Sequence, residues 1–140
     1  MSDELVLETQ DLTRFWNTFK SLDGFEPECF LQLVEDTGED TTLKILARFT
    51  ETLKEAEGHV LEGQINEDAN VIWRACHKVA GSANLIGFVQ YGVFSRDLSH
   101  QIRANPDYSN YIPEIGSFLA QTRDIQFQIK ETITNLSEHL

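Results

Sequence analysis

The chain has 140 residues, of which 41% are hydrophobic and 24% are charged. This length and composition suit a single soluble globular domain. The chain is too short for a kinase or nucleotide-hydrolase domain together with any further domain. The chain has 11 Lys and Arg residues and 23 Asp and Glu residues, so the formal net charge is −12. A surface of this charge repels phosphate backbones and anionic lipid headgroups, so we expect neither nucleic acid nor membrane as a partner.

The two cysteines, Cys29 and Cys76, form neither a metal-ligand spacing nor a redox pair. They predict two reduced thiols in a reducing compartment. Residues 1–20 lack a basic start and a small-residue cleavage site, and no stretch of the chain approaches the ~18 apolar residues of a membrane span. We therefore expect a cytoplasmic protein without a bound metal.

Apolar residues recur at helical spacing along almost the whole chain, which predicts an all-α fold. A short apolar stripe predicts a first helix within residues 1–22, and Asp23-Gly24 ends it as a turn. A second short helix should begin near Pro27, a residue favoured at the first helical position, and stop at Gly38. The stripe of the first helix consists of Leu12, Phe15, Trp16, Phe19 and Leu22.

Four longer amphipathic segments follow. They span about residues 41–63, 66–86, 89–104 and 111–138, and Asn66 is the expected N-cap of the second of them. Short loops between such segments predict an antiparallel four-helix bundle over residues 41–140, with the two short N-terminal helices added to it. We expect one domain over residues 1–140, in which 1–22 is a helical extension, and a monomer.

The segment 66–86 presents two different faces when its residues are placed at about 100° per residue. Its core-facing residues are Ile72, Cys76, Val79, Ala83 and Ile86. His77 lies about 140° from the centre of this apolar face, so its side chain should point to solvent.

The residues around His77 on this helix are small. Ala80, Gly81 and Asn84 follow it at the positions that surround a helical side chain. Glycine in mid-helix costs about 1 kcal/mol relative to alanine, so the presence of Gly81 needs a reason. One reason is room for a large partner to approach the imidazole. The other, close packing of a neighbouring helix, is the weaker one because Gly81 should face away from the core.

The run from His77 to Gly87 resembles the motif of histidine-containing phosphotransfer (HPt) domains, in which a phosphoacceptor histidine is followed four residues later by glycine, then by small residues and a second glycine. The similarity covers about residues 23–104. It implies a carrier of phosphoryl groups between aspartates of receiver domains. Carried over by position, His77 is the phosphoacceptor, Gly81 gives clearance, and Ser82 and Gly87 are the remaining motif positions.

Two positions depart from the family pattern. Many members have a lysine three residues after the histidine, where this chain has Ala80, and the nearby cation is Lys78. Many also have a glutamine on the next helix that hydrogen-bonds the imidazole. The corresponding position here is Ser99, with Gln101 and Arg103 close by.

The chemistry of an exposed neutral imidazole agrees with this resemblance, because its free ring nitrogen can attack a phosphoryl group. Phosphoryl transfer needs positioning and charge neutralisation, and Mg²⁺ should come from the partner receiver domain, so we expect no cofactor in this chain. Lys78, Arg74 and Arg103 are the candidate cations for this neutralisation. For each of them, an ordinary solvated surface charge is an equally good interpretation. The expected partners are response-regulator receiver domains and a hybrid sensor histidine kinase.

A partner-binding patch should surround the predicted acceptor. Trp73, one turn before His77, should form a shallow apolar surface with Ala80 and Asn84, and Arg74 lies beside it. The alternative is that Trp73 is half-buried against the next helix.

Two other functions would use the same surface or the same histidine. A helical adaptor or sequestering protein that binds a receiver or kinase without carrying phosphate would use the same surface. A hydrolase with His77 as base is weak, since no Ser, Cys or acid is placed beside it. The chain has no nucleotide loop or kinase motif, so it should not phosphorylate itself from ATP. The remaining histidines, predicted to be ordinary surface or half-buried residues, are His59, His100 and His139.

Overall fold

The computed structural model describes residues 24–138, and the side chains of residues 24–131. Over these residues it is all-helical, which confirms the predicted fold class. The helix predicted within residues 1–22 lies outside the described part. The elements are α2 (Pro27–Thr37), α3 (Glu39–Ile65), α4 (Ala69–Ile86), α5 (Val89–Ala104), the 3-10 turn η1 (Tyr108–Tyr111) and α6 (Ile112–Glu138).

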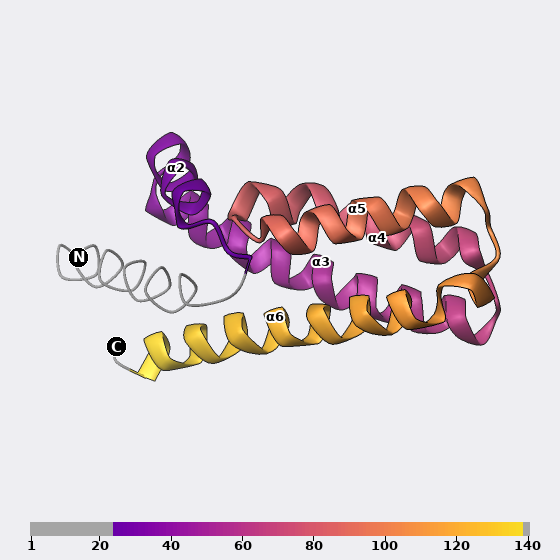
Figure 1. Ribbon diagram of the computed structural model, residues 1–140. Coiled ribbons are helices and arrows are strands. Elements are labelled where there is room, and N and C mark those ends of the chain that lie inside the picture. Colours follow the sequence, from indigo (N-terminus) through magenta and orange to yellow (C-terminus); the bar gives the residue numbers. More distant parts are fainter. Residues whose placement is uncertain (1–23, 139–140) are drawn as a thin grey trace, which may run out of the picture.

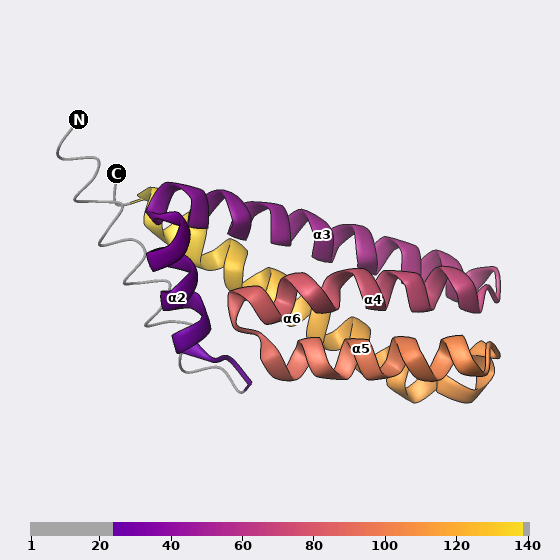
Figure 2. The same ribbon diagram turned by 90° about the horizontal axis from the view of Figure 1, so that it is seen from above.

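The four long helices run alternately up and down the long axis of the molecule (Figure 1). Helix α4 packs against α3 on one side and most extensively against α5 on the other, while α6 packs against α3 and more lightly against α5. Helix α2 lies across one end of the molecule (Figure 2). The helix that carries His77 is therefore held from two sides.

The start of α4 differs from the prediction. Asn66 does not cap this helix but is the residue after α3, and Glu67 then turns the chain at a φ of 53°. The N-cap is Asp68, whose Oδ1 accepts hydrogen bonds from the backbone N–H groups of Asn70 and Val71 at 3.1 and 3.3 Å. A carboxylate satisfies two otherwise unpaired N–H groups there, which decides the position of the helix start.

The predicted core face of α4 is confirmed, because Ile72, Cys76, Val79, Ala83 and Ile86 are all buried. Burial raises the pKa of the Cys76 thiol to about 12, so this side chain stays protonated near neutral pH. The next layer of the core joins α5 to α6 through a 2.7 Å hydrogen bond between the hydroxyls of Tyr91 and Thr122. One face of α4 is thus fixed in the core.

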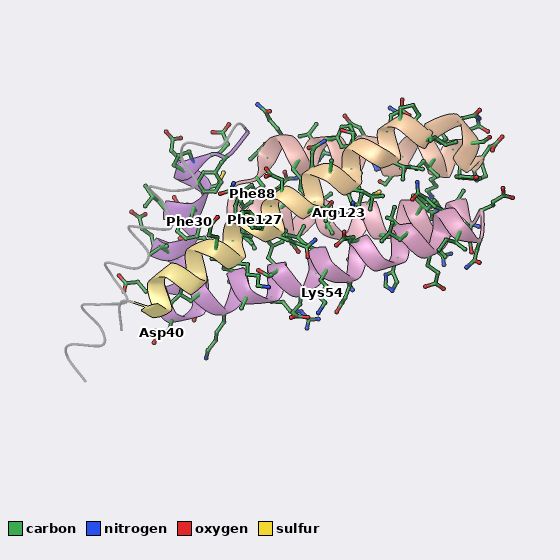
Figure 3. All side chains as sticks on the ribbon, turned by 90° about the horizontal axis from the view of Figure 1, so that it is seen from below. Phe30, Asp40, Lys54, Phe88, Arg123 and Phe127 are labelled. Carbon is green, nitrogen blue, oxygen red and sulfur yellow. The ribbon has the colours of Figure 1, made fainter. Side chains whose placement is uncertain are left out.

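Gly87 closes the tight connection between α4 and α5. Its φ of 125° disfavours any other residue, and a Cβ there would lie 2.7 Å from the carbonyl oxygen of Glu26. The Gly87 carbonyl in turn accepts a 2.6 Å hydrogen bond from the Glu26 N–H. Phe30 and Phe88 fill the same end of the molecule (Figure 3). The second glycine of the motif therefore has a structural role.

The opposite surface, formed by α3 and α6, is of a different kind. Arg123 of α6 forms an ion pair with Glu57 of α3, and Gln126 donates a 3.2 Å hydrogen bond to the same carboxylate. Figure 3 views this surface, with Lys54 on α3 and the exposed Phe127 on α6. In the described part of the chain, every helix is too short or too polar to cross a lipid bilayer.

Candidate functional site

His77 lies in the middle of α4 with an exposed side chain, as predicted. Gly81, one turn further along, is also exposed, and a Cβ built on it would meet no atom within 4 Å. The alternative in which a neighbouring helix packs closely on Gly81 is therefore wrong. The space beside the imidazole is open to a visiting molecule.

Close helix packing occurs instead at Gly92 of α5. A Cβ at this position would overlap with Asn84 Oδ1 and would lie 3.1 Å from the carbonyl oxygen of Ala80. Ala80 is accordingly only 3% exposed, and Asn84 is half-buried with an Oδ1 that has no hydrogen-bond partner. The expectation that Ala80 contributes to an exposed patch is wrong, because this side of α4 faces α5.

His100 of α5 lies directly beside the predicted acceptor. The centroids of the His77 and His100 rings are 6.5 Å apart, and the ring planes are inclined by 35°. Both side chains are exposed, and among the described residues neither makes a hydrogen bond or ion pair. The prediction that His100 is a surface residue is confirmed, but its place beside His77 was not foreseen.

A signal for this neighbour was present in the sequence. Helices α4 and α5 form an antiparallel hairpin, so residues equally far before and after its turn should lie side by side. Asn84 and Gly92 are equally far from Phe88, and His77 and His100 are nearly so. The hairpin register therefore points to His100 once the turn is located.

Trp73 brings two arginines together one turn before His77. The guanidinium carbon of Arg103 lies 5.1 Å from the indole ring centroid, and that of Arg74 lies 5.6 Å away. Both distances suit cation–π attraction. The indole N–H donates a 3.1 Å hydrogen bond to Asn70 Oδ1, and Trp73 is half-buried. Two of the three candidate cations are thus held on the His77 side of the α4–α5 pair.

Lys78 and Ser82 lie towards α3. The Lys78 ammonium forms a 3.6 Å ion pair with Glu55 of α3, and both side chains are largely solvated, so this pair contributes little stability. Ser82 is half-buried and lines a hollow between α3 and α4, together with Ile45 and Leu85. The structure therefore places these two expected supporting residues on the far side of α4 from His100.

Among the described residues, neither Ser99, the position that corresponds to the family's glutamine, nor the nearby Gln101 forms a hydrogen bond with the His77 imidazole. Ser99 is fully buried, and its hydroxyl donates a 2.7 Å hydrogen bond to the carbonyl oxygen of Arg96. Gln101 is exposed, and its backbone carbonyl accepts a 2.9 Å hydrogen bond from the Tyr111 hydroxyl. The α5 side chain whose ring lies beside that of His77 is His100, whereas Ser99 is buried in the core.

The site as a whole offers a nucleophilic ring nitrogen, a second imidazole and two guanidinium groups on the surface of a chain with a net charge of −12. Such a cluster suits a small anionic group better than a cation. The described residues contain no group of three or more His, Cys, Asp or Glu side chains that could hold a metal ion. Comparison with protein-family models, curated proteins and solved structures finds no match for the chain.

Proposed function

We propose that this protein is a histidine phosphotransfer protein in a His-Asp phosphorelay, with His77 as its phosphoacceptor. The observation that carries the proposal is the exposed His77 imidazole beside the open space over Gly81. The opposite face of α4 is buried, which fixes the helix that carries the imidazole. A nucleophile held on a fixed helix, with free approach on one side, suits in-line phosphoryl transfer.

The transfer step is a simple exchange of bonds. The lone pair of one His77 ring nitrogen forms an N–P bond, and the P–O bond to the aspartate of a phosphorylated receiver breaks. The bonding electrons leave with the aspartate, which becomes a carboxylate. The imidazole keeps the proton on its other nitrogen or releases it to water. Passing the group to a second receiver aspartate is the same step in reverse.

The partners in this proposal are receiver domains of response regulators and of a hybrid sensor histidine kinase. A receiver supplies the acidic pocket and the Mg²⁺, while Arg74 and Arg103 give the approaching acidic surface a complementary charge. We further propose that α3 to α6 form an antiparallel four-helix bundle, and that the protein acts as a cytoplasmic monomer.

The test uses a panel of receiver domains phosphorylated with ³²P-labelled acetyl phosphate in the presence of Mg²⁺. We expect acid-labile, alkali-stable label to move onto this chain from at least one receiver. His77→Gln should abolish the label completely. His59→Gln removes a second exposed histidine and should leave it unchanged, which makes it the matched control.

Two results would overturn the proposal. Label that persists in His77→Gln would place the acceptor elsewhere. A stable complex with a phosphorylated receiver, without any label on this chain, would instead support the adaptor function, in which the same surface binds a receiver but carries no phosphate.

A further inference from the structure

The His77 and His100 rings are close but do not bond to each other. A direct N–H···N hydrogen bond brings two imidazole centroids to about 5 Å, whereas these centroids are 6.5 Å apart. The gap is therefore wider than a direct bond needs, and both rings are open to solvent. It is suited to a group that is attached to one ring and accepts a hydrogen bond from the other.

A phosphoryl group has this chemistry, because it presents three strong acceptor oxygens. An imidazole supplies one N–H donor when neutral and two when protonated. The Ser99 hydroxyl is not available for this role, because it binds the Arg96 carbonyl in the core, and the Arg103 guanidinium lies over the Trp73 ring. His100 is the α5 side chain whose ring lies beside that of His77, so its N–H is well placed to reach a group on His77.

We propose that His100 is a positioning residue that donates an imidazole N–H to the phosphoryl group carried by His77. This inference rests on the proposed function and names a second residue of the same site. The hydrogen bond exists only while the group is attached to His77. It therefore stabilises the phosphorylated state and slows its loss to water.

The charged neighbours of His100 fit this role. Arg103 lies one turn after it on α5, and Arg96 lies one turn before it, so two positively charged residues flank His100 on this helix. Asp97, the nearest acidic residue on α5, lies about one turn before His100. Viewed down the helix axis, Arg96 and Arg103 lie on one flank of His100 and Asp97 lies on the other. From α4, Arg74 adds a further positive charge on the same surface.

The experiment needs no protein partner. Potassium phosphoramidate phosphorylates exposed histidines chemically, and site-resolved mass spectrometry then follows the loss of phosphate from His77 after the reagent is removed. His100→Leu should shorten the half-life of phosphorylated His77 about threefold to tenfold, the effect of one lost hydrogen bond. A glutamine amide N–H lies near the position of the imidazole Nε2, and an asparagine amide near Nδ1. Either His100→Gln or His100→Asn should therefore restore the half-life.

The half-life of phosphorylated His77 is also measured in a control variant. His59→Leu makes the same substitution at an exposed histidine of α3 and should not change the half-life. Circular dichroism and the urea midpoint show that each variant is folded. The proposal is overturned if the leucine, glutamine and asparagine variants all behave alike. If His100 controls the half-life but no receiver donates phosphate, the proposed function fails while this inference stands. If receivers donate phosphate but His100→Leu has the wild-type half-life, this inference fails while the proposed function stands.

Discussion

Two exposed histidines of this protein are each followed four residues later by glycine, yet the two regions are built differently. In α3, His59 precedes Gly63, which is buried, and a Cβ there would lie 2.6 Å from Ile72 Cγ1. In α4, His77 precedes Gly81, which faces empty space. The first glycine allows α3 and α4 to pack closely, and the second leaves the imidazole accessible.

The charges around the two histidines differ as well. His59 has Glu55 one turn before it and Glu62 one turn after it. His77 has an arginine one turn before it and an imidazole from α5 beside it. The negative charges repel a phosphoryl group at the first position, and the guanidinium of Arg74 attracts it at the second. The spacing of histidine and glycine is therefore not sufficient to define a site without the surroundings.

The sharpest way to break the comparison is to fill the space over Gly81. Gly81→Trp should fold normally but lower phosphoryl transfer from a receiver at least about tenfold, because it blocks the approach to His77. Gly58→Trp is the matched control, since Gly58 is exposed on α3 and also has open space around its Cβ position. Transfer rates that are equal in the two variants would show that clearance over Gly81 is irrelevant.

Substitution of the buried Gly63 of α3 should affect stability rather than transfer. Gly63→Ala should lower the free energy of unfolding by about 1–3 kcal/mol, because the added methyl group collides with Ile72 and with the backbone carbonyl of Asp68. Urea denaturation followed by circular dichroism measures this change. A variant as stable as the wild type would mean that α3 and α4 are packed less closely than described.

Gly81→Ala should instead raise the free energy of unfolding by about 0.5–1 kcal/mol. The methyl group has room at this exposed position, and alanine is the better helix former. The same urea titration checks it, side by side with Gly63→Ala. A loss of stability at Gly81 would contradict the open environment that separates the two glycines.

The smallest effect concerns the α3–α6 surface. Hydrogen bonding to Arg123 holds the pKa of Glu57 below its ordinary value of 4.5, even though partial burial opposes this. The interaction therefore stabilises the fold above about pH 4.5 and is lost as the pH falls through the lowered pKa. Arg123→Met should cost less than about 1 kcal/mol at pH 7. Its urea midpoint should approach that of the wild type in acid, and a difference independent of pH would argue against the ion pair.

Much of the fold could be predicted from the sequence because strong local signals fix it. The end of α5 lies at the predicted residue, since Asn105-Pro106 stops the helix, and the core face of α4 follows from its apolar spacing. The predicted start of α4 was wrong because Asn66 and Asp68 are both good capping residues. Only the turn at Glu67 decides between them, and its backbone conformation has no clear sequence signal.

The site was predicted correctly on one helix but not across two. The periodicity of α4 correctly exposes His77 and Gly81, but it does not show which helix covers the adjoining face. For that reason Ala80 was placed on the surface and His100 was treated as unconnected. The exact rotation of α5, which buries Ser99 and brings His100 to the acceptor, depends on the close contact at Gly92. That contact is a property of the packed pair.

The most direct test of the contrast between His59 and His77 is to locate the phosphate on the chain after transfer from a phosphorylated receiver. Proteolysis at neutral or alkaline pH followed by mass spectrometry assigns the modified residue. We predict phosphate on His77 and none on His59. Phosphate on His59, or on any other residue while His77 stays unmodified, would contradict the account.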